Sequence, residues 1–329
     1  MKRIVSLILA ITVMCSFCLF MTACGGENSG TQSSTENTKY KIGICQLVKH
    51  DALDAATEGF MQALKDKLGE DKVEFDVQNA ANDSNTCTTI VNSFVSSKVD
   101  LILANATPAL QSAANATTTI PILGTSITEY GVALGIKDFN GTVGGNISGT
   151  SDLAPLDGQA DAMLELLPDV KNVGLLYCSA EANSEYQVKV VEEYLAGKGV
   201  TTKRYSFSDS NDVSAVTTTA AAECDAIYIP TDNTAASCTE TIGNIVRSAK
   251  KPVFAGEAGI CNGCGIATLS ISYRDLGYKT GEMAAKILTG EANISEMPIE
   301  YAAAEKMYNE EICNELGITV PSDYKPLSK

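Results

Sequence analysis

The sequence predicts an α/β protein of two doubly wound lobes, each built on a parallel sheet, with a hinge between them. Short apolar segments alternate with amphipathic segments over about 290 residues from Tyr40 onward, which is enough chain for two lobes. The alternation is interrupted by a glycine-rich stretch at residues 141–149 and then starts again. Apolar runs such as VDLILA are continuous, as expected for strands that are covered on both faces.

In the first half, continuous apolar runs predict strands and a 3.6-residue period predicts helices. The first helix places Leu53, Phe60 and Leu64 on one face. Thr107 is expected to cap the third helix, with Pro108 at its first helical position. The predicted strands are residues 40–46, 73–77, 99–104 and 120–123, and the predicted helices are residues 51–68, 84–97 and 107–114.

The second half repeats this alternation. The predicted strands are residues 173–177, 201–205, 226–229, 253–254 and about 265–271. The predicted helices are residues 156–167, 184–196, 213–222, 233–249 and 276–288, and residues 298–329 should hold a strand, a short helix and a tail. We expect a first lobe of residues 40–148 with a return segment at about 274–295, and a second lobe of residues 149–273 with about 296–329.

Residues 1–23 have a basic start, an apolar run and small residues before a cleavage site, which are the marks of a secretory signal. Cys24 follows MTA, a pattern that resembles a bacterial lipobox and predicts lipidation of its sulfur. Residues 24–39 have the composition of a flexible tether. We therefore expect a lipoprotein on the outer face of the cell membrane. The alternative is an uncleaved anchor, because residues 4–21 are about long enough to cross a bilayer.

Charge and motifs exclude several functions. The formal net charge is −16, or −18 without the signal, which argues against a nucleic-acid partner. The chain has one histidine, His50, no GxSxG elbow and no phosphate loop, so we expect neither catalysis nor a cofactor. We interpret His50 as a residue beside a helix start or a ligand. A surface hydrolase that uses His50 is the alternative.

The cysteines do not have the spacing of a disulfide framework, and several lie in apolar runs where a thiol acts as a small hydrophobic group. Cys261 and Cys264 form a CxxC that we place in a glycine-rich loop before a strand. Free thiols or a local disulfide are the favoured interpretation. A zinc site or a redox motif are the alternatives, although no second pair of zinc ligands is visible.

A ligand of such a fold should bind at the carboxyl ends of the strands. The loops there are short, polar and free of arginine, and they offer hydroxyls, amides and a few carboxylates. This set suits a zwitterion, whose ammonium group Asp232 or Glu257 could hold. Helix capping is the alternative role for Thr107, Ser184 and Asp232.

Five segments, in order, resemble the ABC-transporter substrate-binding lipoproteins of the tryptophan/tyrosine-binding type: IGICQLVKHDALDAATEGF, VDLILANATPALQSAA, NISGTSD, EANSEYQ and PTDN. The resemblance runs from Tyr40 to about Leu288. It implies a type I periplasmic-binding-protein fold, a ligand between two closing lobes, and an ABC permease as partner. Residues 126–130 depart from the segment that this family usually has, at a strand end that faces the cleft.

Carried over by motif, the resemblance implies that Thr107 and Ser151 hold a carboxylate and that Asp232 holds an ammonium group, with Leu47 and Tyr130 beside the ligand side chain. The expected ligand-binding residues are Gln46, Leu47, Thr107, Tyr130, Ser151, Asp152, Asn183, Ser184, Asp232, Asn233 and Glu257. We expect a monomeric receptor for an amino-acid-like ligand, with an aromatic amino acid as the favoured ligand. A receptor for a nucleoside or a sugar, and a sensory module, are the alternatives.

Overall fold

The computed structural model describes residues 39–327, which lie in the compact unit Thr38–Lys329. The predicted signal at residues 1–23, the lipidation of Cys24 and nearly all of the tether lie outside the described residues. Among residues 39–327, the helices are all too short or too polar to cross a membrane.

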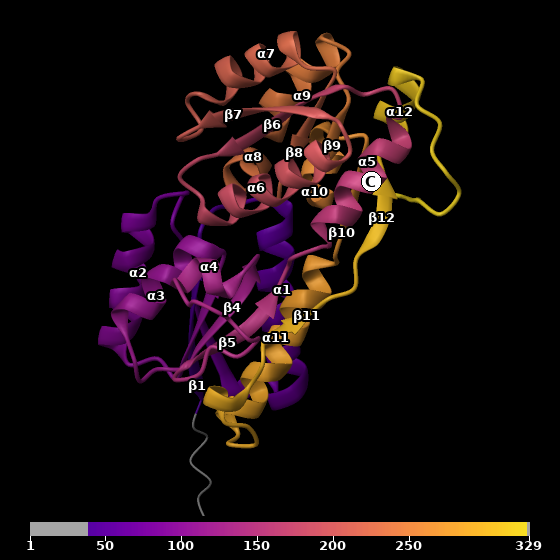
Figure 1. Cartoon of the computed structure of the whole chain (residues 1–329). Helices are drawn as coiled ribbons and strands as arrows, with labels where there is room; N and C mark the ends of the chain where they lie inside the picture. The colour runs from indigo at the N-terminus through magenta and orange to yellow at the C-terminus, as the bar shows by residue number, and fades with distance from the viewer. Residues whose placement is uncertain (1–38, 328–329) are drawn as a thin grey trace, which may run out of the picture. The chain divides into compact units, whose positions relative to one another are not determined.

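The first sheet has the strand order β11-β5-β4-β3-β1-β2, and each neighbouring pair is parallel. Helices α1 and α11 cover one face of this sheet, and α2, α3 and α4 lie on the other (Figure 1). The strands are β1 (Tyr40–Gln46), β2 (Val73–Asn79), β3 (Leu101–Asn105), β4 (Ile122–Ile127), β5 (Ile147–Ser151) and β11 (Glu300–Tyr301). The helices are α1 (Asp51–Leu68), α2 (Ser84–Ser97), α3 (Thr107–Ala116), α4 (Tyr130–Leu134) and α11 (Tyr273–Leu288), with 3-10 turns η1 (Glu70–Lys72) and η2 (Ile294–Glu296).

The second sheet has the order β13-β12-β10-β9-β8-β6-β7, and only the β10–β12 pair is antiparallel. Helices α5, α6 and α12 pack on one face, and α7, α9 and α10 pack on the other. The strands are β6 (Asn172–Cys178), β7 (Thr201–Phe207), β8 (Ala226–Ile229), β9 (Val253–Ala255), β10 (Ala267–Ser270), β12 (Glu305–Tyr308) and β13 (Lys325–Pro326). The helices are α5 (Leu156–Leu166), α6 (Ala182–Gly197), α7 (Val213–Glu223), α8 (Asn233–Ser237), α9 (Thr239–Ser248), α10 (Ala258–Cys264) and α12 (Glu310–Leu316).

The prediction of two doubly wound lobes with mostly parallel sheets is confirmed, and we call each sheet with its helices the first and the second lobe. The chain passes between the sheets three times, after β5, after β10 and after β11. The expected boundaries differ from these crossings by a few residues. β5 stays in the first sheet through Ser151, and Glu300–Tyr301 pairs with β5 before the chain returns to the second sheet.

Three local expectations were wrong. The CxxC lies in helix α10 rather than in a loop, because the Glu257 side chain accepts hydrogen bonds from the N–H groups of Gly259 and Ile260 and so caps this helix. The helix expected over residues 233–249 is broken into α8 and α9 at Cys238. Ala106 precedes α3 where Thr107 was expected, and no side chain caps that helix. All eight described cysteines are free thiols.

Helices α1 and α11 pack with their backbones in close contact through glycines. A Cβ atom at Gly277 would lie 1.9 Å from the carbonyl oxygen of Ala56, and one at Gly59 would lie 2.1 Å from that of Arg274. Only glycine permits this approach. The contact holds the first half of α1 against the first turns of α11, and α11 begins directly after the crossing that follows β10.

Candidate ligand-binding site

A cavity lies between the two lobes at the carboxyl ends of their central strands. Its volume is about 10 Å³, which is room for about one water molecule. Both lobes and the crossing segments contribute to its wall. The lining residues are His50, Leu53, Ser126, Thr128, Asp152, Asn183, Thr231, Asp232, Asn233, Ala236, Glu257 and Tyr273.

Three polar atoms around this cavity have no hydrogen-bond partner. They are Ser126 Oγ, Asp152 Oδ1 and Asn183 Oδ1, out of six such buried side-chain atoms in the part of the chain that the structure describes. A buried polar atom without a partner costs about 1–3 kcal/mol, so such atoms rarely gather without a reason. Their convergence on one cavity indicates a ligand that supplies the missing partners.

The orientation of the Asn183 amide is fixed by its neighbours. Its Nδ2 donates to Glu181 Oε2 at 3.2 Å and to the carbonyl oxygen of Thr231 at 3.1 Å. Because both of these atoms only accept, the amide nitrogen must face them. The unpartnered Oδ1 is therefore an acceptor, as is a carboxylate oxygen of Asp152. Together they suit a ligand group with several N–H donors.

The cavity wall is acidic and, among the described residues that line it, has no lysine or arginine. Burial raises the pKa of Asp152 to about 6, although hydrogen bonds with the Tyr273 and Thr128 side chains oppose this shift. Burial likewise raises the pKa of Glu257 to about 7. The pKa of Asp232 rises to about 7 through burial and, next, through repulsion from Glu181. Each of these shifts marks a carboxylate without a cationic partner, which a bound ammonium group would supply.

In two of these carboxylates, both oxygens already accept hydrogen bonds from backbone N–H groups. Asp232 Oδ1 accepts from the N–H of Ala235 at 2.8 Å, and its Oδ2 accepts from the N–H of Cys178 at 2.6 Å. Glu257 uses both oxygens to cap α10. The structure thus gives Asp232 the capping role that the sequence left open, and Asp152 is the carboxylate with a free oxygen.

Five of the eleven expected ligand-binding residues line the cavity: Asp152, Asn183, Asp232, Asn233 and Glu257. The other six are buried but do not reach it: Gln46, Leu47, Thr107, Tyr130, Ser151 and Ser184.

Hydrogen bonds within the protein explain why several polar members of this second group are turned away. The Tyr130 hydroxyl donates to the carbonyl oxygen of Thr150, and Ser151 Oγ donates to that of Thr128. The Gln46 side chain bonds to groups of the first lobe, including Thr57 Oγ1 at 2.7 Å.

Several lining residues were not predicted as ligand contacts. Ser126 and Thr128 belong to residues 126–130, the segment that departs from the family pattern, so the sequence did mark this region. Ser126 has a φ of 55°, a left-handed conformation that is unusual for a residue other than glycine. Tyr273 was missed because the last long helix was expected to begin at residue 276.

Two hydrogen bonds join the lobes directly beside the cavity. His50 Nε2 lies 3.3 Å from Asn233 Oδ1, and Asn82 Nδ2 donates to Thr234 Oγ1 at 2.9 Å. His50 and Asn82 belong to the first lobe, and their partners begin α8 in the second. Burial lowers the pKa of His50. The two lobes are therefore in contact beside the cavity.

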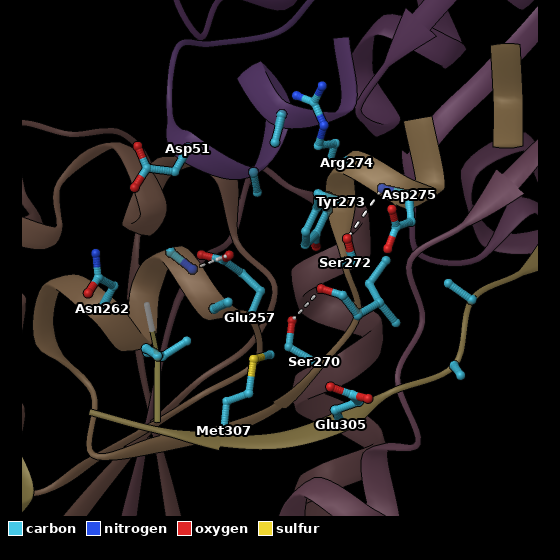
Figure 2. Close-up of a pocket in the computed structure, with 18 residues that line it drawn as sticks. Asp51, Glu257, Asn262, Ser270, Ser272, Tyr273, Arg274, Asp275, Glu305 and Met307 are labelled. Atoms are coloured by element: carbon cyan, nitrogen blue, oxygen red, sulfur yellow. Dashed lines mark hydrogen bonds between the residues drawn. The ribbon is translucent and has the colours of Figure 1, made fainter. Parts of the chain in front are cut away.

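A second cavity of about 640 Å³ lies where the chain crosses after β10 and β11 (Figure 2). Its wall includes Asp51, Asn262, Arg274 and Met307. Glu257 and Tyr273 line both cavities, so the two spaces are neighbours. In residues 39–327 no group of three or more histidine, cysteine or acidic side chains is arranged to hold a metal ion.

Comparisons with known proteins agree with this architecture. A family model described as ABC transporter substrate binding protein matches residues 41–325. The chain is 36% identical over 306 residues to a tyrosine-binding protein of Clostridioides difficile, covering 91% of this chain and 87% of the relative. A structure titled as an ABC domain in complex with L-Trp, from Streptococcus pneumoniae, is 32% identical with a TM-score of 0.82, covering 87% of this chain and 97% of its own.

A third comparison bears on the arrangement of the lobes. The ligand-free, open structure of a substrate binding protein with adhesive properties from Clostridium difficile is 37% identical, over 88% of this chain and 99% of its own. Its TM-score is only 0.67, although its identity is higher than that of the L-Trp complex. The lower score indicates that the lobes here are arranged less like the open form, in agreement with the contacts between them.

Proposed function

Because the chain belongs to the family of ABC transporter substrate-binding proteins, we propose that it binds an aromatic amino acid, tyrosine or tryptophan, between its lobes. The observation that carries the proposal is the pair of unpartnered acceptors, Asp152 Oδ1 and Asn183 Oδ1, on one cavity. An α-ammonium group has three N–H donors and a positive charge, and it would satisfy both atoms. The names of the two relatives support the choice of ligand.

The α-carboxylate is assigned to the first lobe. Ser126 Oγ lacks a partner there and can donate a hydrogen bond. Helix α1 begins beside the cavity after His50, which makes no side-chain cap, so its first N–H groups offer a partial positive charge. This assignment moves the two ends of the ligand away from Thr107, Ser151 and Asp232.

Binding requires the lobes to separate. A cavity of about 10 Å³ cannot hold an amino acid, since sites for small molecules have about 300–1,000 Å³. In the proposed cycle the ligand enters an open form, the three crossing segments bend, and the hydrogen bonds between the lobes re-form around it. The closed form would then deliver the ligand to an ABC permease. No catalytic step is involved.

The proposed location follows from the N-terminal sequence. Lipidation of Cys24 would hold the protein on the outer face of the cell membrane, and residues 24–39 would let the lobes reach the permease. Mass spectrometry of the mature N-terminus tests this part. A diacylglyceryl group on Cys24 is expected, and an unmodified chain that begins at Met1 would contradict it.

Calorimetric titration of the full chain in detergent tests the ligand. The protein is first unfolded and refolded to remove any ligand carried through purification, and is then titrated with each of the twenty L-amino acids, a nucleoside and a sugar. We expect one-to-one binding of L-tyrosine, L-tryptophan or both. Heat from the nucleoside or the sugar alone would overturn the proposal. Tyramine, which lacks the carboxylate, and 3-(4-hydroxyphenyl)propionate, which lacks the ammonium group, should both bind more weakly than L-tyrosine.

A further inference from the structure

Glu181 is a buried carboxylate that does not line the cavity. It nevertheless accepts hydrogen bonds from two residues that do, Asn183 and Asn233, and from Thr234. Oε2 accepts from the Asn233 N–H at 3.1 Å, from Asn233 Nδ2 at 2.6 Å and from Asn183 Nδ2 at 3.2 Å. Oε1 accepts from the Thr234 N–H at 2.9 Å and from Thr234 Oγ1 at 2.8 Å. Five donors converge on one side chain, so only an acceptor without hydrogens fits.

This arrangement fixes the contacts between the lobes. Because Asn233 Nδ2 donates to Glu181, its Oδ1 must face His50 as an acceptor, and His50 must carry its proton on Nε2. Because the Thr234 hydroxyl donates to Glu181, its oxygen can accept from Asn82 Nδ2. Each partner in the second lobe is thus set as an acceptor toward a donor in the first.

The same carboxylate orients the proposed ligand contact. Asn183 Nδ2 donates to Glu181, and this leaves Asn183 Oδ1 facing the cavity. We propose that Glu181 is the positioning residue for closure: its carboxylate orients Asn183 toward the ligand, and Asn233 and Thr234 toward the opposite lobe. The part that concerns the ligand rests on the proposed function. The part that concerns the lobes rests only on the contacts described.

The proposal predicts which rate constant changes. The contacts of His50 and Asn82 with the second lobe exist only when the lobes are closed, whereas an open form meets the ligand without them. Loss of these contacts should therefore speed release and leave association almost unchanged. A general folding defect would instead lower the fraction of protein that binds.

Energy transfer between two dyes on the refolded full chain in detergent measures these rates. The dyes are attached to azidophenylalanine in place of the exposed residues Ser93 in α2 and Thr219 in α7, and the probes are L-tyrosine and L-tryptophan. The single variants are Glu181→Gln, His50→Ala and Asn82→Ala. Two double variants combine Glu181→Gln with His50→Ala or with Asn82→Ala. Glu185→Gln is the matched control, since Glu185 lies in the first turn of α6, the helix that directly follows Glu181, and pairs with Arg204 at the surface.

We expect His50→Ala and Asn82→Ala each to speed release about fivefold, the value of one neutral hydrogen bond, and Glu181→Gln about tenfold. In the Glu181→Gln background, either further substitution should add less than about twofold, because its contact has already lost its orientation. Glu185→Gln should behave as the parent. Full additivity, or release from Glu181→Gln at the parent rate, would overturn the proposal.

Two further readouts keep the test decisive. If Glu181→Gln does not fold, Glu181→Asp replaces it. This variant keeps the carboxylate but places it one methylene further from its donors, and the same order of release rates is expected.

If the parent binds neither amino acid, the proposed ligand is wrong, but the dye pair still tests the role of Glu181. The closed fraction of the unliganded chain should fall in Glu181→Gln, and an unchanged closed fraction would reject the inference.

Discussion

The Tyr273 hydroxyl donates a hydrogen bond of 2.9 Å to Asp152 Oδ2, and this bond joins two of the three segments that cross between the lobes. Asp152 directly follows β5, and Tyr273 begins α11. Both side chains are buried, and the bond leaves Asp152 Oδ1 on the cavity. One of the three crossing segments therefore carries the carboxylate to which we assign the ligand ammonium group. Asp152 would thus contact the ligand and also lie in a segment that bends when the lobes close.

Asp152→Asn should weaken the binding of L-tyrosine or L-tryptophan about 100-fold at pH 7.5. The substitution keeps the shape of the side chain but removes the charge that faces the ammonium group, and a hydrogen bond to a charged group is worth about 1.5–3 kcal/mol. Calorimetric titration measures the change. Asp157→Asn, an exposed carboxylate at the start of α5, removes the same charge as a control and should bind as the parent does. Parent-like affinity in Asp152→Asn would refute the assignment.

The same substitution should stabilise the unliganded protein at pH 7.5. Burial raises the pKa of Asp152 to about 6. Between about pH 4 and pH 6 the folded protein therefore keeps the proton on Asp152, whereas the unfolded chain has released it. Stability from this group is present below about pH 4 and is lost as the pH rises through about 6. Asp152→Asn should therefore raise the free energy of unfolding by about 2–3 kcal/mol at pH 7.5 and by little at pH 4.

Thermal unfolding of the refolded, ligand-free parent and of Asp152→Asn at the two pH values gives the comparison. A Tm gain that is equal at both pH values would show that the effect does not come from ionisation of Asp152.

Affinity should also depend on pH in a direction set by Asp152. The ammonium group needs the ionised carboxylate, so affinity should fall as the pH drops through about 6, by at most about tenfold per pH unit. Tyr273→Phe removes a hydrogen bond that favours the ionised form and should move this midpoint to higher pH. Titrations between pH 5 and pH 8 in steps of about half a unit locate the midpoint. A midpoint that moves to lower pH would show that the bond does not act in this way.

Gly277→Ala should destabilise the protein by about 3 kcal/mol. The new methyl group would meet the Ala56 carbonyl oxygen at 1.9 Å, and backbone in a packed helix pair cannot easily move away. Gly197→Ala is the matched control, since Gly197 ends α6 with no atom within 4 Å of the added carbon. The control should be neutral or stabilising by up to about 1 kcal/mol. Urea unfolding measures both, and equal effects would mean that the α1–α11 contact is not tight.

Local sequence patterns predicted much of the fold, because strands and helices here follow their apolar periodicity closely. The bounds of α1 and α2 agree with prediction to the residue. The errors arose where one side chain outweighs the pattern, as at α10, where Glu257 caps a helix that contains two glycines. Such a cap depends on how Glu257 is placed after β9, and the periodicity of the segment does not contain that information.

The candidate site was less predictable for a related reason. Asp232 lies at the cavity as expected, but its oxygens are taken by the N–H groups of Ala235 and Cys178, and Cys178 comes from another strand. Likewise, four of the five hydrogen bonds to Glu181 come from Asn233 and Thr234 at the start of α8, about 50 residues further along the chain. Position along the chain indicates which loops meet, whereas the choice between a free and an occupied carboxylate requires the atoms of the folded protein.

A crystal structure of the refolded protein with L-tyrosine or L-tryptophan would show which side chains hold the ammonium group of the ligand. We predict the ligand between the lobes, with its ammonium nitrogen within hydrogen-bonding distance of both Asp152 Oδ1 and Asn183 Oδ1 and its carboxylate beside Ser126. An ammonium nitrogen bound to Asp232 instead, or a ligand confined to the larger cavity beside Arg274, would refute the assignment to Asp152 and Asn183.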